Sequence, residues 1–586
     1  MIHLLDIHVS NLIAAGEVVD RPSSALKEVV ENSVDAKATI ITIEIKSGGI
    51  SYMRVSDNGE GMDVNDLGRS VLRHATSKIK DEEDLTKIQT LGFRGEALAA
   101  ISSVCDLKIF TKTKEAETGY MLESQSGQNT KISEAGCAEG TTVVMEQLFS
   151  KIPARQKFLK RDATEGMYCK WIIEKIALSK PFVSFKFIQD EKQKIFTPGN
   201  GNYKDTIYSV FGAQIADSLI PIGNFEDTHI SDEEDITVYG FVSKIENGQK
   251  TRANENFFVN GRYVYSKTIM SALEEAYKSI AETGDFPVCA LYIKIDESKI
   301  DINVHPQKME IKFSDERQVY SAVYYAVKEA LGNFGDDAHP QFIPTIPTIS
   351  KNEAKKEKKD KEEDAVAEFK GKYFDLSYKK PETSSYDKYD YKILGEAFYG
   401  YILIEKAEKI IIVDKHAAHE RIIYDIIIKK AAEKNKNSDF KTQILFIPEE
   451  VKLTAKEAAG ILDIENEIKN FGIVFKWKDD NTVLVTEVPA EISDINTGDI
   501  IKEAAYLSSE ENKAADRTIF EKLAMLSAKK SAACKAAMKS GISDSTQNIS
   551  WLVERVLSYE NVRYCPHGRP IAFEITKNEI EKQFKR

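Results

Sequence analysis

The sequence predicts a multidomain protein of the α/β (α+β) class, with folded parts joined by one flexible linker. Its 586 residues exceed what a single hydrophobic core normally organises, so about three folded units are expected. Strand-like and helix-like segments alternate from residue 1 to about 330, and they do so again from residue 391 onward. Between these regions, residues 332–390 change in character, first to proline-rich and then to highly charged sequence.

The linker is predicted from its composition. The segment around 340 is rich in proline, and 351–364, "KNEAKKEKKDKEED", holds six basic and six acidic residues and a single alanine. Such a stretch cannot offset the entropy of ordering by burying apolar surface, which favours a flexible linker. An isolated charged helix is the alternative.

The overall composition indicates a soluble protein of the cytoplasm. Apolar residues make up 42% and charged residues 30% of the chain, and no apolar run approaches the roughly 20 residues of a membrane span. The N-terminus carries Asp6 in its apolar part and lacks a basic start, unlike a signal peptide. Six scattered cysteines fit a reducing compartment. The net charge of −13 argues against a protein that coats nucleic acid everywhere, but it leaves local basic surfaces open.

A first polar cluster is predicted on the helix "SSALKEVVENSVDA", residues 23–36. Glu28, Asn32 and Asp35 follow one another at i, i+4 and i+7 and therefore share a face. On that face, a carboxylate suits the activation of a water molecule and a carboxamide oxygen suits Mg²⁺. An amphipathic surface helix is the alternative explanation.

Three further segments strengthen a nucleotide site. "SYMRVSDNGEGM" (51–62) is a strand ending in Asp57, which can accept a hydrogen bond from an adenine amino group, and Gly59 and Gly61 let the backbone approach a ligand. "LGFRGEALAAISS" (91–103) is a loop entering a helix whose free N–H groups suit phosphate oxygens. "GTTV" (140–143) is a turn before a strand.

In this order, "ENSVDA", "DNGEGM", "GFRGEAL" and "GTT" resemble the four ATP-binding motifs shared by type II topoisomerase subunits, Hsp90-type chaperones, histidine kinases and MutL proteins. With "IAAGEVVDRP" (13–22) and "HATSK" (74–78), the chain is similar to the MutL family of mismatch-repair ATPases in particular. The resemblance implies a two-layer α/β sandwich ATPase domain at 1–205 and a transducer subdomain of the ribosomal S5 domain 2-like type at 206–331.

The resemblance also implies roles for individual residues. Glu28 is expected to be the general base for ATP hydrolysis, Asn32 to hold Mg²⁺, and Asp57 to bind adenine with support from Thr141. Lys308, in "NVHPQK", is expected to reach the γ-phosphate. The loops and helix start around the nucleotide are expected to include Gly61, Gly92, Phe93, Arg94, Gly95, Glu96, Ala97 and Leu98. Arg262 and Lys267 are weaker candidates for contact with the DNA backbone.

A second polar cluster is predicted at "DKHAAHERIIYD" (414–425), which follows a hairpin formed by "YGYILI" and "KIIIV". If a helix begins there, His416 and Glu420 lie at i and i+4 and can share a cation, whereas His419 points elsewhere. The pattern is not the zinc-protease H-E-x-x-H. The polar start of a surface helix is the alternative.

Two distant segments supply further metal ligands. Cys534 lies late in an alanine-rich helix, and Cys565 and His567 flank a proline in "CPHGRP". Together with the carboxylates and His416, they form a donor set suited to zinc or another transition metal. A buried structural cysteine is the alternative for Cys534.

"DKHAAHERIIYD", "ACK", "CPHGRP" and the terminal "EKQFKR" resemble the motifs of MutL proteins that nick DNA. The resemblance implies a dimerisation and endonuclease domain at 391–586, with Zn²⁺ and/or Mn²⁺ held by Asp414, His416, Glu420, Cys534, Cys565 and His567. Asp414 and Glu420 are the catalytic candidates, and Arg569, Lys585 and Arg586 are candidates for binding the substrate phosphate. Lys415 stands where the family pattern has glutamine, and Asp425 stands where it has glutamate.

The expected partners follow from the same resemblance. They are double-stranded DNA, the mismatch-recognition protein MutS, a second copy of the chain, and the sliding clamp through "QILFIP", Gln443–Pro448. In that peptide Phe446 replaces the usual Leu or Ile, and an ordinary edge strand is the alternative. A nucleoid-associated cytoplasmic protein is expected. The rival function is a non-nucleolytic ATP-dependent matchmaker whose C-terminal metal is structural, while "NVHPQK" and "CPHGRP" argue against a topoisomerase subunit.

Overall fold

The computed structural model describes residues 16, 18–76, 78, 95–223, 236–244, 248–249, 251–278, 285–301, 310–332, 391–398, 400–434, 442–490, 496–508, 521–528, 530, 546–558, 564–566 and 569–584. The chain divides into two compact units, one of residues 1–342 with 452–463 and the other of 343–451 with 464–586. Within the described ranges, no helix is long and apolar enough to cross a membrane.

The first unit begins with an eight-stranded sheet in the order β5-β4-β3-β6-β2-β1-β7-β8. β1 pairs antiparallel with β2, so that Ile41 lies opposite Asp57, and it pairs in parallel with β7. Asp57 also lies opposite Thr141 of β6, which brings two motifs of the predicted nucleotide site together. The strands are β1 (Ile40–Lys46), β2 (Tyr52–Asp57), β3 (Asp106–Lys112), β4 (Gly119–Gln125), β5 (Gln128–Ala135), β6 (Gly140–Glu146), β7 (Ser184–Gln189) and β8 (Lys192–Phe196).

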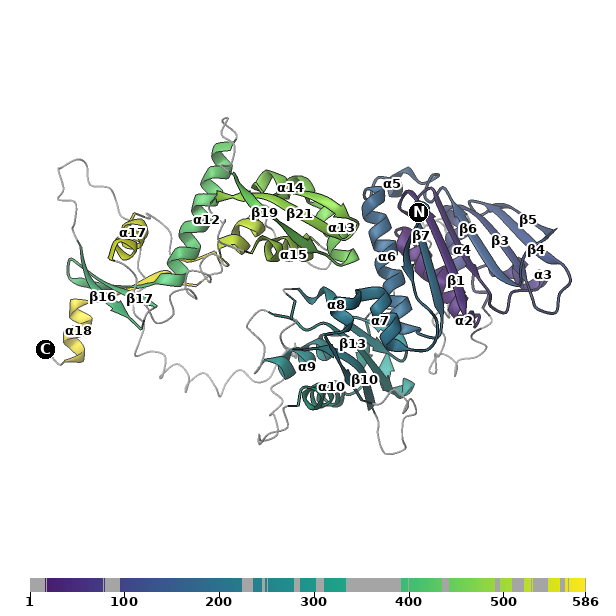
Figure 1. Ribbon diagram of the computed structural model, residues 1–586, viewed down its shortest axis with the longest axis horizontal. Helices are drawn as coiled ribbons and strands as arrows, with labels where there is room; N and C mark the ends of the chain where they lie inside the picture. The colour runs from purple at the N-terminus through teal and green to yellow at the C-terminus, as the bar shows by residue number, and fades with distance from the viewer. Residues whose placement is uncertain are drawn as a thin grey trace, which may run out of the picture. The chain divides into compact units, whose positions relative to one another are not determined.

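Helices α2, α4 and α6 share one hydrophobic core with this sheet (Figure 1). α2 begins at Pro22, whose fixed φ suits a first helical position, and Leu26, Val29 and Val30 of its inner face are buried. Alternate residues of β1, such as Ile41, are buried as well, as expected for a strand with one covered face. The helical segments are α2 (Pro22–Asp35), η1 (Ser47–Gly49), α3 (Val64–Ser70), α4 (Ala97–Val104), α5 (Pro153–Gln156) and α6 (Asp162–Ser179).

A five-stranded sheet, β12-β11-β13-β10-β9, follows in the first unit. Helices α9 and α10 pack on it through a core that includes Ile269, Leu273, Val319 and Val323. The elements are α7 (Tyr203–Phe211), α8 (Ala213–Ala216), β9 (Leu219–Ile222), β10 (Ile236–Ser243), η4 (Arg252–Asn254), β11 (Glu255–Val259), β12 (Arg262–Val264), α9 (Lys267–Tyr277), β13 (Cys289–Ile295), η5 (Glu297–Lys299), β14 (Ile300–Asp301), β15 (Lys312–Phe313) and α10 (Glu316–Ala330).

The C-terminal part of the chain has a four-stranded sheet, β16-β17-β18-β22, and a three-stranded sheet, β19-β21-β20. The hairpin predicted before "DKHAAHE" is present, since β17 and β18 pair antiparallel and α12 follows directly. The elements are β16 (Lys392–Ala397), β17 (Tyr401–Lys406), β18 (Lys409–Asp414), α12 (Lys415–Lys434), β19 (Thr442–Lys452), α13 (Ala455–Asp463), α14 (Glu465–Phe471), β20 (Val474–Asp479), β21 (Thr482–Pro489), α15 (Thr497–Ser508), α17 (Thr546–Leu557), β22 (Ala572–Thr576) and α18 (Lys577–Gln583).

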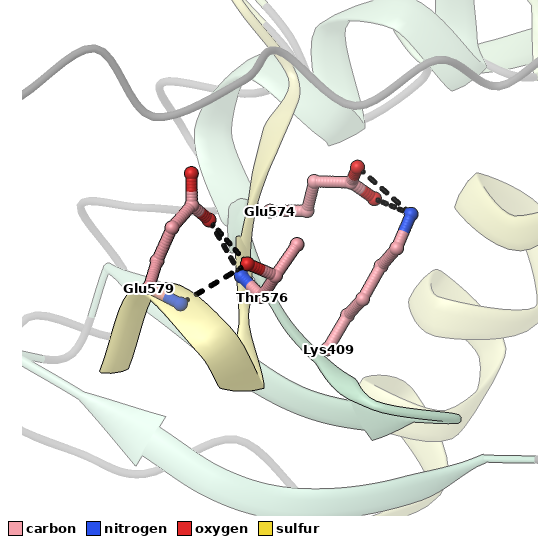
Figure 2. Close-up of polar contacts among 4 residues, drawn as sticks. All are labelled: Lys409, Glu574, Thr576 and Glu579. Carbon is pink, nitrogen blue, oxygen red and sulfur yellow. Dashed lines mark hydrogen bonds and ion pairs between the residues drawn. The ribbon is translucent and has the colours of Figure 1, made fainter. Parts of the chain in front are cut away.

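The pairing of β18 with β22 brings the "CPHGRP" region to the start of α12. Lys409 Nζ binds both carboxylate oxygens of Glu574 across these strands, at 2.9 and 3.0 Å (Figure 2). A capping box at Thr576 and Glu579 then starts α18, with each side chain accepting from the other residue's backbone N–H (Figure 2). These contacts hold β22 in register beside the strand that ends at Asp414.

Candidate nucleotide and metal sites

The predicted polar face of α2, with Glu28, Asn32 and Asp35, lies on a helix as expected. Lys27 and Glu31 add two further charges beside it. Lys27 Nζ lies 3.0 Å from Glu31 Oε1 and 3.6 Å from Glu28 Oε1. The Glu28 side chain retains 14% of its exposure, so water can reach a carboxylate that is otherwise held in place. Burial lowers the pKa of the Lys27 ammonium, but Glu31 and Glu28 outweigh that effect and raise it above its ordinary value.

Asn32 lies next to a cation supplied by the chain itself. Lys78 Nζ, from the "HATSK" segment, donates to Asn32 Oδ1 at 2.9 Å and to Asp35 Oδ2 at 2.6 Å. A hard carboxamide oxygen beside a carboxylate is a donor pair that Mg²⁺ accepts. The oxygens of Asn32 and Asp35 therefore fit the Mg²⁺ ion that Asn32 is expected to hold. The Asn32 carboxamide oxygen is also the atom that Lys78 binds.

Asp57 is fixed as a hydrogen-bond acceptor at the end of β2. Its Oδ2 accepts from Ser33 Oγ at 2.7 Å, and its Oδ1 accepts from the backbone N–H groups of Gly59 at 2.9 Å and Thr141 at 3.2 Å. Burial raises the pKa of the Asp57 carboxyl, while these three hydrogen bonds oppose that rise. The result is a partly buried carboxyl whose orientation is determined by three donors.

Two glycines allow the backbone to close around Asp57. Gly61 has φ +71°, and a Cβ on it would lie 2.3 Å from the Lys112 carbonyl oxygen. Gly140 has φ +101°, and a Cβ there would lie 2.1 Å from the Asp57 carbonyl oxygen. Only glycine fits both the conformation and the space.

Sequence analysis missed two side chains that support this region. Thr111 Oγ1, which is buried, accepts from Met62 N at 2.9 Å and lies 3.1 Å from Thr141 Oγ1, so it joins the loop after β2 to β6. Ser33 holds Asp57 from α2. Ser33 directly follows Asn32 within "ENSVDA" and could have been found, whereas Thr111 gave no signal because it lies in an ordinary strand.

The predicted lid segment is described only in part. Gly95 has φ +62°, and a Cβ on it would lie 2.5 Å from the Ala75 carbonyl oxygen, so "HATSK" and "GFRGEAL" meet at the start of α4. Glu96 precedes that helix, Ala97 is its first residue, and Leu98 packs against the core. Gly92, Phe93, Arg94 and Lys308 lie outside the described residues.

In the C-terminal part, Asp414 ends β18 and starts α12. Its backbone N–H donates to the Ile571 carbonyl at 2.9 Å, and its Oδ1 accepts from Ala417 N at 2.9 Å, as a helix N-cap does. The second carboxylate oxygen is not used by that cap. Asp414 is thereby fixed between α12 and the segment before β22.

The predicted pair on the first turns of α12 is present. His416 Nε2 lies 3.2 Å from Glu420 Oε1, and the Glu420 side chain is fully buried. Arg569 Nη2 donates to the same oxygen at 2.8 Å, and the Arg569 carbonyl accepts from Cys565 N at 2.8 Å. Burial lowers the pKa of the Arg569 guanidinium, but Glu420, then Cys565 and Asp414, outweigh it and raise the pKa.

Three of the six predicted metal ligands, Asp414, Glu420 and Cys565, therefore act on one guanidinium, and a fourth, His416, lies against Glu420. Imidazole, carboxylate and thiol groups are a donor set that zinc and manganese sites use. Within the described ranges, no group of three or more such side chains is arranged to hold a metal ion. Cys534 and His567 lie outside those ranges, as do Lys585 and Arg586. The donor chemistry fits a cation, and Glu420 also pairs with Arg569.

Lys415 and Asp425, the two residues that depart from the family pattern, have partners other than the predicted metal ligands. Lys415 Nζ pairs with Glu396 of β16, and both side chains are largely buried. Asp425 accepts from Arg421 Nε at 3.0 Å and lies 2.9 Å from its Nη2. His419 accepts or donates a hydrogen bond at the Lys415 carbonyl, 3.0 Å away, and stacks on Trp551. None of the three is part of the Asp414–His416–Glu420 group.

The predicted clamp peptide lies on β19, an edge strand of its sheet. Three of its apolar side chains are largely exposed: Ile444 at 75%, Phe446 at 100% and Ile447 at 77%. Apolar side chains in a row on an open edge are unusual for a strand that serves only its own sheet.

Comparison with known proteins covers the whole chain. Residues 20–147 match the histidine kinase-, DNA gyrase B- and HSP90-like ATPase family, residues 207–332 match the DNA mismatch repair protein C-terminal domain, and residues 394–542 match the MutL C terminal dimerisation domain. The DNA mismatch repair protein MutL of Thermoanaerobacter pseudethanolicus is 35% identical over 628 aligned residues, which cover 100% of this chain and 99% of that protein. MutL of Caldanaerobacter subterraneus subsp. tengcongensis is 35% identical over 611 residues, with the same coverage. The Aquifex aeolicus MutL ATPase domain complexed with ADP is 26% identical, with a TM-score of 0.37, and the match covers 48% of this chain and 93% of that one.

The N-terminal fold and the site around Asp57 define an ATPase domain of the histidine kinase, gyrase B and HSP90 class. The chain belongs to the MutL family of DNA mismatch repair proteins. The predicted family and the predicted mixed α/β fold class are thus confirmed.

Proposed function

We propose that this chain is a homodimeric mismatch-repair protein that hydrolyses ATP in its N-terminal part and nicks DNA in its C-terminal part. ATP hydrolysis couples mismatch recognition by MutS to the nick. The proposal rests above all on the convergence of Asp414, Glu420 and Cys565 on one guanidinium, with His416 bound to Glu420.

In the nucleotide site, Asp57 accepts a hydrogen bond from the adenine amino group, with Thr141 holding the carboxylate. Glu28 takes a proton from the attacking water, and Asn32 holds Mg²⁺. Lys308 pairs with the γ-phosphate, and residues 92–98 cover the phosphates. The ordering of Asp57 by Ser33, Gly59 and Thr141 supports this assignment, because binding then requires little reorganisation.

In the nuclease site, Asp414, His416, Glu420, Cys534, Cys565 and His567 hold Zn²⁺ and/or Mn²⁺. A bound metal of this kind supplies Lewis-acid stabilisation of charge on phosphoryl oxygens and lowers the pKa of water. Arg569, which is half exposed, has one face toward Glu420 and is available to pair with a DNA phosphate. Gln443–Pro448 would dock on the sliding clamp.

Two variants test the two activities separately. Glu28→Ala should abolish ATP turnover while nucleotide still binds, and retained turnover would remove Glu28 from the role of base. Asp414→Asn should abolish metal-dependent nicking of supercoiled DNA while ATPase activity persists. Nicking that survives in Asp414→Asn, across Mn²⁺ and Zn²⁺, would show that the nuclease site lies elsewhere, whereas a natural chain that does not nick DNA with either metal would favour the rival proposal of a matchmaker whose C-terminal metal is structural.

A further inference from the structure

Lys27 lies between two carboxylates of its own helix, α2. Its ammonium nitrogen is 3.0 Å from Glu31 Oε1 and 3.6 Å from Glu28 Oε1. Glu31 follows Lys27 by about one helical turn, and Glu28 is the next residue along the chain. One cation is therefore shared between the proposed base for ATP hydrolysis and a second carboxylate that has no part in the proposed mechanism.

These three side chains are largely removed from water. The exposed fraction is 13% for Lys27, 14% for Glu28 and 10% for Glu31. Removing charges from water costs free energy, which their mutual attraction offsets only when the geometry is favourable. A lysine four residues before a glutamate is also the less favourable order on a helix. Stabilisation of α2 is therefore a weak explanation for the group.

A comparable pair on α6 shows which feature is specific to Lys27. Lys170 and Glu174 have the same order and spacing as Lys27 and Glu31, and both of their side chains are 11% exposed. Lys170 Nζ lies 3.9 Å from Glu174 Oε1. Neither residue of this second pair belongs to the proposed nucleotide site. What distinguishes Lys27 is its additional contact with Glu28.

The contact between Lys27 and Glu28 is an ion pair and not a hydrogen bond, because 3.6 Å exceeds the length of a hydrogen bond. Among the described parts of the chain, no other side chain lies within ion-pair or hydrogen-bond distance of Glu28. The carboxylate is thus oriented by a nearby charge, while its oxygens stay available to accept a hydrogen bond from water. A general base needs this combination of a fixed direction and free acceptor oxygens.

Glu31 determines how close Lys27 comes to Glu28. Glu31 is buried, with 8% of its surface exposed, and it holds the ammonium at the shorter of the two distances. Without the charge on Glu31, the Glu28 carboxylate would attract the ammonium alone, and Lys27 would move within hydrogen-bond distance of it. A hydrogen bond to an ionised carboxylate favours the ionised form and would make Glu28 a weaker base.

We propose that Lys27 is a positioning residue for ATP hydrolysis, which orients the Glu28 carboxylate while Glu31 keeps the ammonium from binding Glu28 directly. Glu28 takes the proton of the attacking water, and Lys27 neither gives nor takes a proton. Glu31 acts only through Lys27. This inference rests on the proposed function of Glu28 as general base.

The test compares variants of Lys27 in the full-length chain by steady-state ATP hydrolysis without DNA. Lys27→Met should lower kcat about tenfold, while KM for ATP changes less than about twofold, because Lys27 orients the base and does not bind the nucleotide. Lys27→Arg should recover part of kcat because it keeps the charge. Lys170→Met is the matched control, since it breaks a pair of the same spacing and burial on α6 and should leave kcat unchanged.

A double-mutant cycle examines the part played by Glu31. Glu31→Gln should lower kcat in the natural chain but should have no further effect in a Lys27→Met background, because Glu31 acts through Lys27. An unchanged kcat in Lys27→Met, an equal loss in Lys170→Met, or independent effects of the two substitutions in the cycle would overturn the inference. If Lys27→Met fails to fold, Lys27→Gln carries the same comparison, because it also removes the charge.

Further outcomes separate this inference from the proposed function. Turnover that persists in Glu28→Ala defeats the assignment of the base. An inactive Glu28→Ala together with normal kcat in Lys27→Met defeats only the role of Lys27. A tenfold loss of nucleotide affinity in Lys27→Met with unchanged kcat would also overturn the inference, because Lys27 would then bind the nucleotide and not position the base.

Discussion

The ammonium of Lys78 lies 2.9 Å from the Asn32 carboxamide oxygen, which is the atom proposed to hold Mg²⁺. Lys78 and the metal therefore compete for one oxygen, and Lys78 also binds Asp35 at 2.6 Å. A cation already bound at the ligand raises the cost of binding a second one there. Mg²⁺ bound at Asn32 would therefore require Lys78 to release this oxygen.

We expect Lys78→Met to lower the Mg²⁺ concentration needed for half-maximal nucleotide binding about threefold to tenfold, equivalent to the net contribution of roughly one ordinary hydrogen bond. Fluorescent-nucleotide binding across a Mg²⁺ titration measures this. Lys37→Met serves as the control, because Lys37 pairs with Glu60 at the surface. A higher Mg²⁺ requirement in Lys78→Met would contradict competition and instead make Lys78 a phosphate ligand.

The hydroxyl of Ser33 is expected to contribute to nucleotide affinity without touching the nucleotide. Ser33→Ala removes one of three donors to Asp57, which costs about 0.5–1.5 kcal/mol and should weaken ATP binding roughly threefold to tenfold. Calorimetric titration with a non-hydrolysable ATP analogue measures the change. Ser24→Ala, on the same helix, removes a hydroxyl that pairs with exposed Asp20 and should leave affinity unchanged. Equal affinity in both variants would mean that Gly59 and Thr141 suffice.

Sequence reasoning could place candidate residues of one helix together because helical periodicity is local, whereas their roles were implied by the resemblance to MutL proteins. Helical spacing alone placed Glu28, Asn32 and Asp35 on one face, and it brought His416 to Glu420. It did not find Thr111 or the burial of Arg262, because their partners come from distant strands and helices. Nothing in "NGRYV" says that its arginine is buried, since that depends on how the β11–β12 hairpin packs on α6.

The same limit applies to Lys415. Its place next to Asp414 in the sequence does not indicate its partner, which is Glu396 on β16. Glu396 reaches Lys415 because β16 pairs with β17. The Gly400 carbonyl also accepts a hydrogen bond from the Lys415 backbone N–H at 2.9 Å, which fixes the start of α12 beside this hairpin. Sheet pairing, which a single sequence specifies weakly, was the missing information.

Glu255 should make the stability of the first unit depend on pH. Neither of its carboxylate oxygens has a hydrogen-bond partner among the described residues. Burial, and then the nearby Glu274 carboxylate, raise the pKa of the Glu255 carboxyl from an ordinary 4.5 to about 9, although Arg252 opposes the rise. The folded state therefore binds this proton more tightly than the unfolded chain does. Its stabilising effect is complete below pH 4.5 and is lost as the pH rises through about 9.

Glu255→Gln should remove this loss, which is on the order of 4 kcal/mol between pH 5 and pH 8. Thermal unfolding of the variant should show a higher Tm than the natural chain at pH 8 and a smaller difference at pH 5. Glu275→Gln changes an exposed carboxylate on α9 and should give parallel curves. A Glu255→Gln chain that loses stability equally at both pH values would show that the carboxyl is ionised and paired.

Lys415→Gln restores the residue of the family pattern, and we expect it to destabilise the C-terminal part. Glu396 would lose the partner of a largely buried ion pair, which costs about 3 kcal/mol. Chemical denaturation followed at the C-terminal transition measures this. The double variant Lys415→Gln/Glu396→Gln should recover much of the stability, and nicking by the folded fraction should be unaffected. Loss of metal binding in the double variant would instead assign Lys415 to the nuclease site.

Phe446 offers the sharpest test of the clamp peptide, because its side chain is fully exposed and no folding energy depends on it. Phe446→Ala should leave the Tm unchanged and weaken binding to the sliding clamp by tenfold or more, as expected for an aromatic anchor that fills a pocket on its partner. Surface plasmon resonance on immobilised clamp measures the affinity. Phe584→Ala, at an aromatic residue that is 74% exposed after α18, is the matched control. Undiminished clamp binding in Phe446→Ala would leave β19 as an ordinary edge strand, and clamp-stimulated nicking would then require a different contact.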